Sequence, residues 1–297
     1  MKTGLDDPNA GRTIGRYLGF TMREVGDPAS GPVHLVGTAP ASPYLRSADD
    51  GIAMGALLAL ADSIAGLCGG LAALPGWVVS TNLMLRSVRR TLIGPIGLES
   101  TVLRAGRNAT VTSVTITDQG ADDALVADGA LTSAVLEPAG GAPDFPRPLL
   151  LVAPPLDPNA TPHLTEFLGT FPIDATTLGL EITDELRNPW GILHGGVTAA
   201  LIDSVGCHAT GGAATTDCVL HFLLPGRIGP VTASATRLGQ RPDGDLVRVE
   251  VRDQGTENRL LAVAITTVRY RFGHRAVEAG LETPPAGPAL RAVRSPA

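Results

Sequence analysis

NPWGILHGGVTAALID, residues 188–203, leads from a Gly-Gly turn into an apolar helix that carries one acid, Asp203. GIAMGALLALADSIAG, residues 51–66, repeats this arrangement with Asp62. A carboxylate inside an apolar helix is costly unless it is paired or hydrogen-bonded. Two acids at matching places therefore indicate a common architecture and not an accident of packing.

The rest of the chain also repeats itself. Four matches occur in the same order in both halves, at offsets that drift only from 141 to 134 residues. Such internal similarity indicates a duplicated unit and dictates the architecture. The matching pairs are Asp62-Ser63 with Asp203-Ser204, LRAGR (103–107) with RLGQR (237–241), ITDQG (116–120) with VRDQG (251–255), and LTSAV (131–135) with ITTVR (265–269).

Each half has the same predicted order of elements. An alternating segment (32–40 or 175–186) precedes the long apolar helix, and four alternating runs rich in β-branched residues follow it. Segments in which apolar and polar residues alternate, bounded by turn residues, are typical of β-strands. One central helix followed by four meandering strands predicts an α+β fold and not a parallel βαβ array. The strand runs are 78–88, 98–106, 109–119 and 124–136, then 217–225, 231–239, 245–254 and 260–272.

The repeat also predicts the domain organisation. We expect an N-terminal domain over residues 1–137 and a C-terminal domain over 163–275. Residues 138–162 are dense in Pro and Gly and predict an extended linker. Residues 276–297 are expected to form a flexible tail.

Composition limits the classes of function. The chain has 297 residues, 44% hydrophobic and 18% charged, with a net charge of −6. This composition fits a packed globular protein. The negative net charge does not indicate a protein that binds nucleic acid through an overall positive charge. The three cysteines have no CxxC spacing, and the N-terminus has no apolar core. Both features favour a cytoplasmic location.

The apolar segment 53–74 approaches the length of a membrane span. Asp62 stands near its middle, where a charge costs about 2.5–3.5 kcal/mol on insertion scales. The segment is also rich in Gly and Ala. We therefore expect a helix buried inside a soluble domain and no membrane span.

The HGG turn at 194–196 has a chemical use. The first N–H groups of a helix have no internal partner and carry partial positive charge, and glycines let a ligand oxygen approach them closely. These are the requirements of an oxyanion hole. Asp203 lies nine residues beyond His194, about 2.5 turns along the same helix. An antiparallel partner helix would instead bring the other acid, Asp62, to this turn.

The pattern Asn188, His194-Gly195-Gly196 and Asp203 resembles the signature of phenylacetyl-CoA thioesterase-like hotdog proteins, acyl-CoA thioesterases of the PaaI type. The resemblance covers roughly residues 15–137 and 163–272, and its motif is strong only in the second half. It implies a double hotdog: two central helices, each wrapped by an antiparallel β-sheet, paired as an intrachain pseudo-dimer. It also makes a homodimer of such chains an expected assembly.

The resemblance implies one complete site that straddles the two halves. Asn188, His194 and Gly195 come from the second half, and Asp62 and Ser80 come from the first, with Gly196 expected to contact substrate. The other site would join Asp203 and Thr215 to the segment 47–55. There Ser47, Ala53 and Met54 replace the Asn, the His and the first Gly, and Gly55 alone survives. We therefore expect one working site and one degenerate site.

The implied reaction is hydrolysis of an acyl-CoA thioester to an acid and CoA. The Gly195 N–H would hold the oxyanion, while Asp62 would act as general base on water or attack directly to give a mixed anhydride. Asn188 would position water or the acid. His194 would orient the loop and assist the leaving thiolate, and Ser80 would hold water or Asp62. No metal or organic cofactor is required.

Other interpretations stay open. Arg86, Arg89 and Arg90 fit either CoA phosphates or a solvated strand edge. A non-catalytic acyl-CoA-binding protein is the main alternative function, since the first half lacks most of the motif. A hotdog dehydratase or hydratase is a third, although neither central helix carries the expected Asp and His pair. Cys68 and Cys207 are expected to be core residues.

Overall fold

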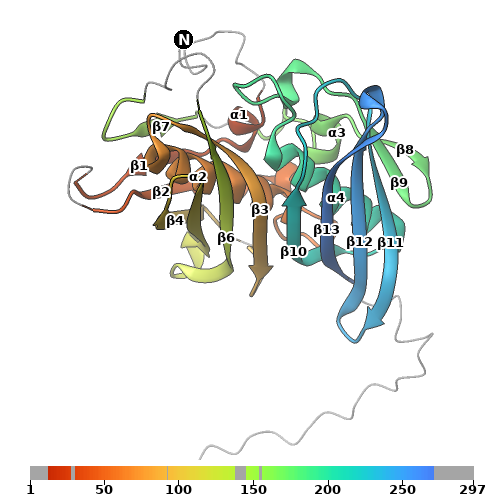
Figure 1. The fold of residues 1–297 in the computed structure, drawn as a ribbon. Coiled ribbons are helices and arrows are strands. Elements are labelled where there is room, and N and C mark those ends of the chain that lie inside the picture. The colour runs from red at the N-terminus through yellow and green to blue at the C-terminus, as the bar shows by residue number, and fades with distance from the viewer. Residues whose placement is uncertain (1–12, 28–30, 92, 138–144, 154–155, 271–297) are drawn as a thin grey trace, which may run out of the picture.

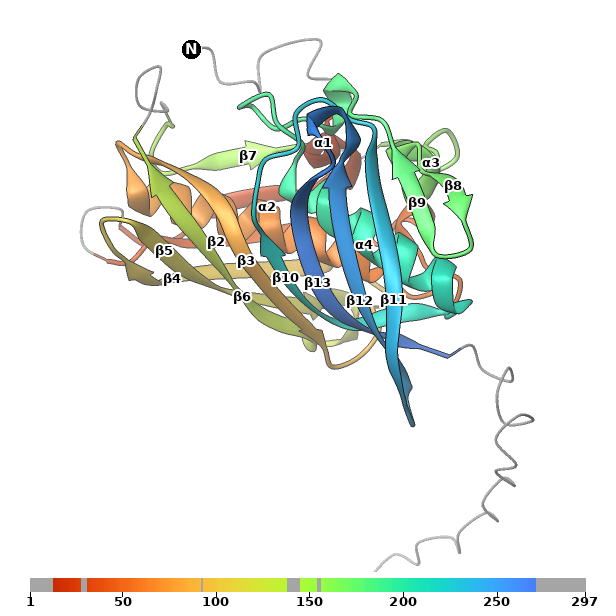
Figure 2. The same cartoon turned by 45° about the vertical axis from the view of Figure 1, so that its right-hand side comes forward.

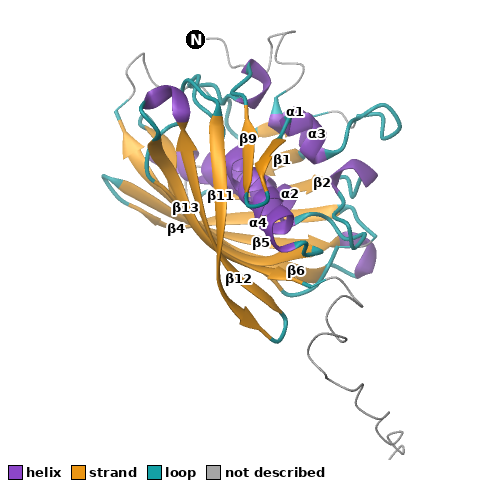
Figure 3. Ribbon diagram, turned by 90° about the vertical axis from the view of Figure 1, so that its right-hand side faces the viewer, coloured by secondary structure: helices purple, strands orange, loops and turns teal. Residues whose placement is uncertain are grey.

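The structure, a computed structural model, describes residues 13–27, 31–91, 93–137, 145–153 and 156–270. Its strands form a 13-stranded sheet in the order β7-β1-β2-β4-β5-β6-β3-β10-β13-β12-β11-β9-β8, which curves around two central helices (Figures 1 and 3). The elements are α1 (Ile14–Leu18), β1 (Thr21–Glu24), β2 (His34–Ala39), α2 (Met54–Ala73), β3 (Trp77–Ser87), β4 (Ile96–Ala105), β5 (Ala109–Asp118), β6 (Ala124–Leu136), β7 (Leu150–Val152), α3 (Leu164–Leu168), β8 (Phe171–Asp174), β9 (Thr177–Leu180), α4 (Gly195–Thr210), β10 (Ala214–Phe222), β11 (Val231–Arg241), β12 (Gly244–Asp253) and β13 (Arg259–Arg269), with 3-10 turns at Pro43–Leu45, Gln119–Ala121, Asp184–Leu186 and Gln254–Thr256.

The two long helices, α2 and α4, pack directly against each other and run antiparallel. Small residues permit the close approach: a Cβ at Gly196 would lie 2.9 Å from the Cα of Ala59, and one at Gly55 would lie 3.0 Å from the Cα of Ala200. Strands β2–β6 contact α2, and β9–β13 contact α4. As expected, each acid is thereby brought to the start of the opposite helix.

The long apolar segment is α2, as predicted. It is long and apolar enough to span a membrane by length and composition, but 67% of that window is buried inside the protein. Its neighbours are α4 on one side and the sheet on the other (Figure 3). These contacts explain why the helix is apolar on nearly every face.

The strand order corrects one prediction. β4, β5 and β6 form a meander, but β3 pairs with β6 and not with β4. β10 likewise pairs with β13, while β11, β12 and β13 meander. Each helix is therefore followed by a strand at the centre of the sheet, and the chain then crosses to the far side. β3 and β10 pair antiparallel, with Met84 opposite Val219, and join the halves into one sheet (Figure 2).

Matching loops lie at matching places in the two halves. Asp118 accepts hydrogen bonds from the backbone N–H groups of Ile93 and Gly94, and Asp253 accepts them from Arg227, Ile228 and Gly229. The repeated DQG motif is therefore turn chemistry: its Asp holds the loop before β4 or β11. The four backbone groups bonded to Asp253 outweigh its burial and hold its pKa below the usual range.

Two other predictions change in detail. The segment 175–186 is not one strand, because β9 ends at Leu180 and residues 184–186 form a 3-10 turn. The predicted linker contains β7, which pairs with β1 and is held by Glu24, whose carboxylate bonds Arg147 and the N–H of Leu149. Parts of that linker (138–144 and 154–155) and the predicted tail lie outside the described residues.

Candidate active site

Asp62 is the centre of the candidate site. It lies within α2, is 6% exposed, and accepts a 2.6 Å hydrogen bond at Oδ1 from the Ser80 hydroxyl of β3. Its other oxygen, Oδ2, lies 3.5 Å from Nδ1 of His194, at the start of α4. The structure therefore brings together three predicted site residues that come from both halves of the chain.

Gly195 is the first residue of α4 and faces the same carboxylate. A Cβ at this position would lie 2.7 Å from Asp62 Oδ2 and 3.0 Å from Oδ1, so any side chain here would displace the acid. The Gly195 N–H makes no hydrogen bond within the described chain. It is a helix N-terminal donor on a residue that lies next to Asp62, and an oxyanion hole requires such a donor.

His194 is the N-cap of α4. Its Nδ1 accepts a 2.9 Å hydrogen bond from the Gly196 N–H, a role usually taken by Ser, Thr, Asp or Asn. Burial lowers the pKa of His194, and the charge of Asp62 opposes this only in part. The ring is therefore neutral with its proton on Nε2, because Nδ1 is the acceptor. Nδ1 and Asp62 Oδ2 are then two acceptors 3.5 Å apart, which is not a hydrogen bond.

Gly196 serves the scaffold in this structure. Its N–H is already bonded to His194, and it packs closely on Ala59 of α2. Asn188 also acts within its own loop. Its Oδ1 accepts hydrogen bonds from the N–H groups of Trp190 (3.0 Å) and Ile192 (3.3 Å). No hydrogen bond joins Asn188 to Asp62 among residues the structure describes.

An aromatic pair beside this loop was not predicted. The rings of Trp77 and Trp190 lie with centroids 4.5 Å apart and planes inclined at 55°. Trp190 belongs to the Asn188 loop, and Trp77 lies three residues before Ser80 on β3. The two residues are the only tryptophans in the sequence, but their 113-residue separation (190 minus 77) gave no sign of contact.

The second half-site has the same scaffold and different chemistry. Asp203 Oδ2 accepts a 2.8 Å hydrogen bond from the Gly55 N–H, so this acid caps α2. Burial raises the pKa of Asp203, and the Thr215 hydroxyl and the Gly55 N–H offset part of that effect. Where the first site has Gly195, this one has the buried side chain of Met54. Asp203 thus caps α2 at Gly55, whereas the matching N–H of α4, that of Gly196, is bonded to His194 and not to Asp62.

The remaining substitutions leave this second site without the motif. Ala53 is the N-cap of α2 and offers no side-chain hydrogen bond. Ser47 replaces the Asn, and its hydroxyl donates to Asp49 Oδ1 at 2.6 Å. The polar groups expected around a thioester carbonyl are therefore confined to the Asp62 site.

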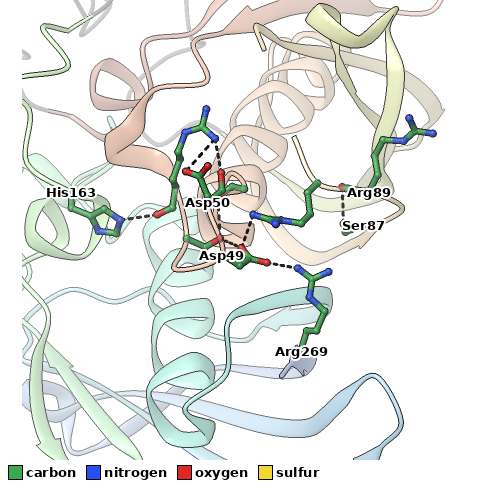
Figure 4. A network of polar contacts seen from close by, with 10 residues as sticks. Asp49, Asp50, Ser87, Arg89, His163 and Arg269 are labelled. Atoms are coloured by element: carbon green, nitrogen blue, oxygen red, sulfur yellow. Dashed lines mark hydrogen bonds and ion pairs between the residues drawn. The ribbon is translucent and has the colours of Figure 1, made fainter. Parts of the chain in front are cut away.

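The structure does not bring the arginine cluster to Asp62. Arg86 lies at the far end of β3, opposite Asp217. Arg89 and Arg90 follow that strand and line a cavity beside Met54 and Thr215, at the second half-site. Figure 4 shows this region, where Arg89 is close to Ser87 and Asp49 lies near Arg269. An arginine site for substrate phosphates is thus not part of the Asp62 site in this structure.

Metal binding and thiol catalysis depend on how the His, Cys, Asp and Glu side chains are grouped and ionised. Within the described part of the chain, no three His, Cys, Asp or Glu side chains are grouped to hold a metal ion. Burial raises the pKa of the Cys68 thiol to about 11 and raises that of Cys207 further, so both stay protonated at neutral pH. The arrangement at Asp62 fits base catalysis with a backbone oxyanion donor.

Comparison with known proteins is consistent with this architecture. No protein-family model matches the chain. A Haemophilus influenzae protein described as a "Putative esterase" is 28% identical over 117 residues, which are 37% of this chain and 83% of that protein.

Solved structures match most of the chain at low sequence identity. The 12:0-ACP thioesterase from Umbellularia californica matches with a TM-score of 0.56 and 10% identity, over 80% of this chain and 94% of the other. The tesB protein of Mycobacterium avium subs paratuberculosis matches with a TM-score of 0.51 and 16% identity, over 80% and 93%. These likenesses show a hotdog-type fold with a large antiparallel sheet and few helices.

Proposed function

We propose that the chain is a thioester hydrolase, an acyl-CoA thioesterase with one active site built across its two halves. One observation carries this proposal: Asp62 of α2, held by Ser80, lies against Gly195 at the start of α4, whose N–H has no partner among the described residues. A buried carboxylate and a helix N-terminal donor around one small space are what water attack on a carbonyl needs. The esterase and thioesterase likenesses support the same reaction class.

In the proposed reaction the thioester oxygen accepts a hydrogen bond from the Gly195 N–H. Asp62 takes a proton from water, and the water oxygen bonds to the carbonyl carbon to give a tetrahedral oxyanion. Collapse of that oxyanion breaks the carbon–sulfur bond and releases the thiolate. The proton on Asp62 then passes to the thiolate or to solvent. A CoA thiolate is a good leaving group, so this step needs no strong acid.

The other residues support these steps. Ser80 fixes the Asp62 carboxylate through Oδ1, which leaves Oδ2 to face the reacting water. His194 caps α4 through Nδ1 and keeps an Nε2–H that is able to donate to the sulfur. Asn188 orders the loop that presents His194 and Gly195. Asp203 takes no part, because it is bonded to the start of α2 and Met54 occupies the oxyanion-donor position.

The proposal includes the organisation of the chain. We infer a double hotdog of the PaaI-like type, made of domains 1–137 and 163–275 joined by residues 138–162, with a tail over 276–297. The antiparallel pairing of α2 with α4 and the β3–β10 junction support an intrachain pseudo-dimer. A further homodimer and a cytoplasmic location belong to the same proposal.

Free-thiol release tests the function directly. Purified protein is assayed with short, long, branched and aryl acyl-CoAs, and with an acyl carrier protein thioester as a separate arm. We expect turnover of at least one acyl-CoA and loss of that turnover in Asp62→Asn. Binding of an acyl-CoA, measured by calorimetry, without thiol release from any substrate would instead support the non-catalytic alternative.

A further inference from the structure

The Trp77–Trp190 pair joins the two halves of the chain beside the Asp62 site. Trp77 is the first residue of β3, and its Nε1–H donates a 3.0 Å hydrogen bond to the carbonyl of Glu137, which follows β6. Trp190 belongs to the Asn188 loop, residues 187–194, which leads to the start of α4. The ring centroids are 4.5 Å apart with planes at 55°, a geometry in which aromatic rings attract each other.

The Asn188 loop makes its hydrogen bonds within its own half. Its backbone N–H to carbonyl pairs are Asn188 with Ile192, Gly191 with Asn188, Leu193 with Gly226, and His194 with Leu186. The Arg187 guanidinium also donates to carbonyls of the second half. Among the described residues, no hydrogen bond of this loop reaches the first half. The ring pair therefore supplies an attraction between the halves that the hydrogen bonds of the loop do not.

Strand β3 thereby contacts both sides of the candidate site. Ser80 fixes the Asp62 carboxylate, and Trp77 contacts the loop that ends next to Gly195. Trp77 and Ser80 are three residues apart, or about 10 Å along the strand. The acid and the oxyanion donor are thus both held through one strand.

The second half-site has the same loop without the aromatic pair. Residues 47–51 close through the same 2.8 Å backbone hydrogen bond as residues 188–192. The offsets are 141 for this loop and 135 for the strand pairing, and they place Asp49 at the position of the loop tryptophan and Gly212 at that of the strand tryptophan. The loop therefore folds without either ring, and the rings occur at the half-site that has the full motif.

We propose that Trp77 and Trp190 are positioning residues for the reaction at Asp62, an inference that rests on the proposed function. Their contact keeps the Asn188 loop docked on β3 and so sets the distance from the Gly195 N–H to the acid. Neither ring takes part in making or breaking bonds. Loss of the contact shifts the docked loop toward an undocked one by roughly 2- to 12-fold, the effect of one aromatic contact.

A double-mutant cycle on thiol release tests this role. Trp77→Ala and Trp190→Ala are each expected to lower kcat about tenfold with KM within twofold, because the oxyanion donor acts mainly in the transition state. The double variant should lose no more than either single variant, since each removes the same contact. Trp190→Phe keeps an aromatic face and should retain kcat within twofold. Phe171→Ala is the control: it removes a 38% exposed ring from the edge strand β8 and should leave kcat unchanged.

Two further measurements do not depend on turnover. The two tryptophans are the only ones in the sequence, so the paired indoles should give an exciton-coupled circular dichroism band that Trp77→Phe and Trp190→Phe each abolish. Hydrogen exchange of a peptide covering residues 188–196 should be faster in Trp77→Ala than in wild type, although the sequence of that peptide is unchanged. Phe171→Ala should leave this exchange rate unchanged.

The proposal is overturned if the wild-type protein lacks the coupled band, if Trp77→Ala leaves exchange of that peptide unchanged, or if the two kinetic effects multiply in the double variant. A rise in KM with unchanged kcat in Trp190→Ala would also overturn it, because the ring would then be a substrate contact. A wild-type protein that shows the coupled band and the exchange response but releases no thiol would support loop docking and contradict the proposed hydrolysis.

Discussion

Gly195→Ala is the most informative small change at the candidate site. The new Cβ would lie 2.7 Å from Asp62 Oδ2, whereas unbonded heavy atoms pack at about 3.5 Å. Asp62 must therefore move by about 0.8 Å, which breaks or lengthens its 2.6 Å bond with Ser80. A misplacement of about 1 Å at a reacting group costs about 100-fold in rate. We expect kcat to fall by about that factor, equivalent to about 2.7 kcal/mol in the barrier.

The assay is thiol release with the best acyl-CoA substrate, with thermal unfolding measured in parallel. Alanine is a better helix former than glycine by up to about 1 kcal/mol, which offsets strain, so the variant is expected to stay folded. Gly66→Ala is the control, because its Cβ would meet nothing closer than Leu131 at 3.9 Å, and kcat should stay within twofold. A Gly195→Ala enzyme with wild-type kcat would refute the placement of Asp62 as the catalytic base.

Three further predictions follow from individual contacts. Ser80→Ala should lower kcat about tenfold through loss of its bond to the catalytic acid, whereas Thr215→Ala, its counterpart, should leave kcat unchanged in the same assay. Burial lowers the pKa of His194, so the unfolded chain takes up a proton before the folded chain does as pH falls below about 6.5. The free energy of unfolding should therefore decrease below that pH. Urea unfolding of His194→Gln should lack this decrease. Burial raises the pKa of Asp203, so the folded chain keeps a proton that the unfolded chain loses above about pH 3.9. The free energy of unfolding should therefore decrease as pH rises from there to the folded-state pKa. Urea unfolding of Asp203→Asn should show a smaller decrease.

The sequence was informative where the signal was local. The two apolar helices and their acids could be predicted from the sequence, because few structures other than a buried helix explain a 20-residue run rich in Gly and Ala with a single acid. The antiparallel contact of these helices followed from geometry, since Asp203 lies too far along its own helix to reach His194. The structure places Asp62 and Gly195 together as that reasoning expected.

Long-range order was harder to predict. Alternation identifies strands but not their neighbours, so the pairing of β3 with β6 was missed. Arg86 follows Ser80 by six residues on the same strand, and at about 3.3 Å per residue it ends about 20 Å away. Closeness in sequence therefore does not place Arg86 beside Asp62, and the choice between CoA phosphates and a solvated strand edge stays open. The contact of Asp49 with Arg269 joins residues 220 positions apart, and no local pattern predicts it.

The central claim is that one acid of the matched pair is catalytic and the other is structural. The most direct test measures acyl-CoA hydrolysis by Asp62→Asn and Asp203→Asn at equal concentrations of folded protein. We expect Asp62→Asn to lower kcat by about 100- to 10,000-fold, the usual contribution of a general base. Asp203→Asn should retain kcat within about threefold of wild type. Loss of turnover in Asp203→Asn with activity kept in Asp62→Asn would contradict the account.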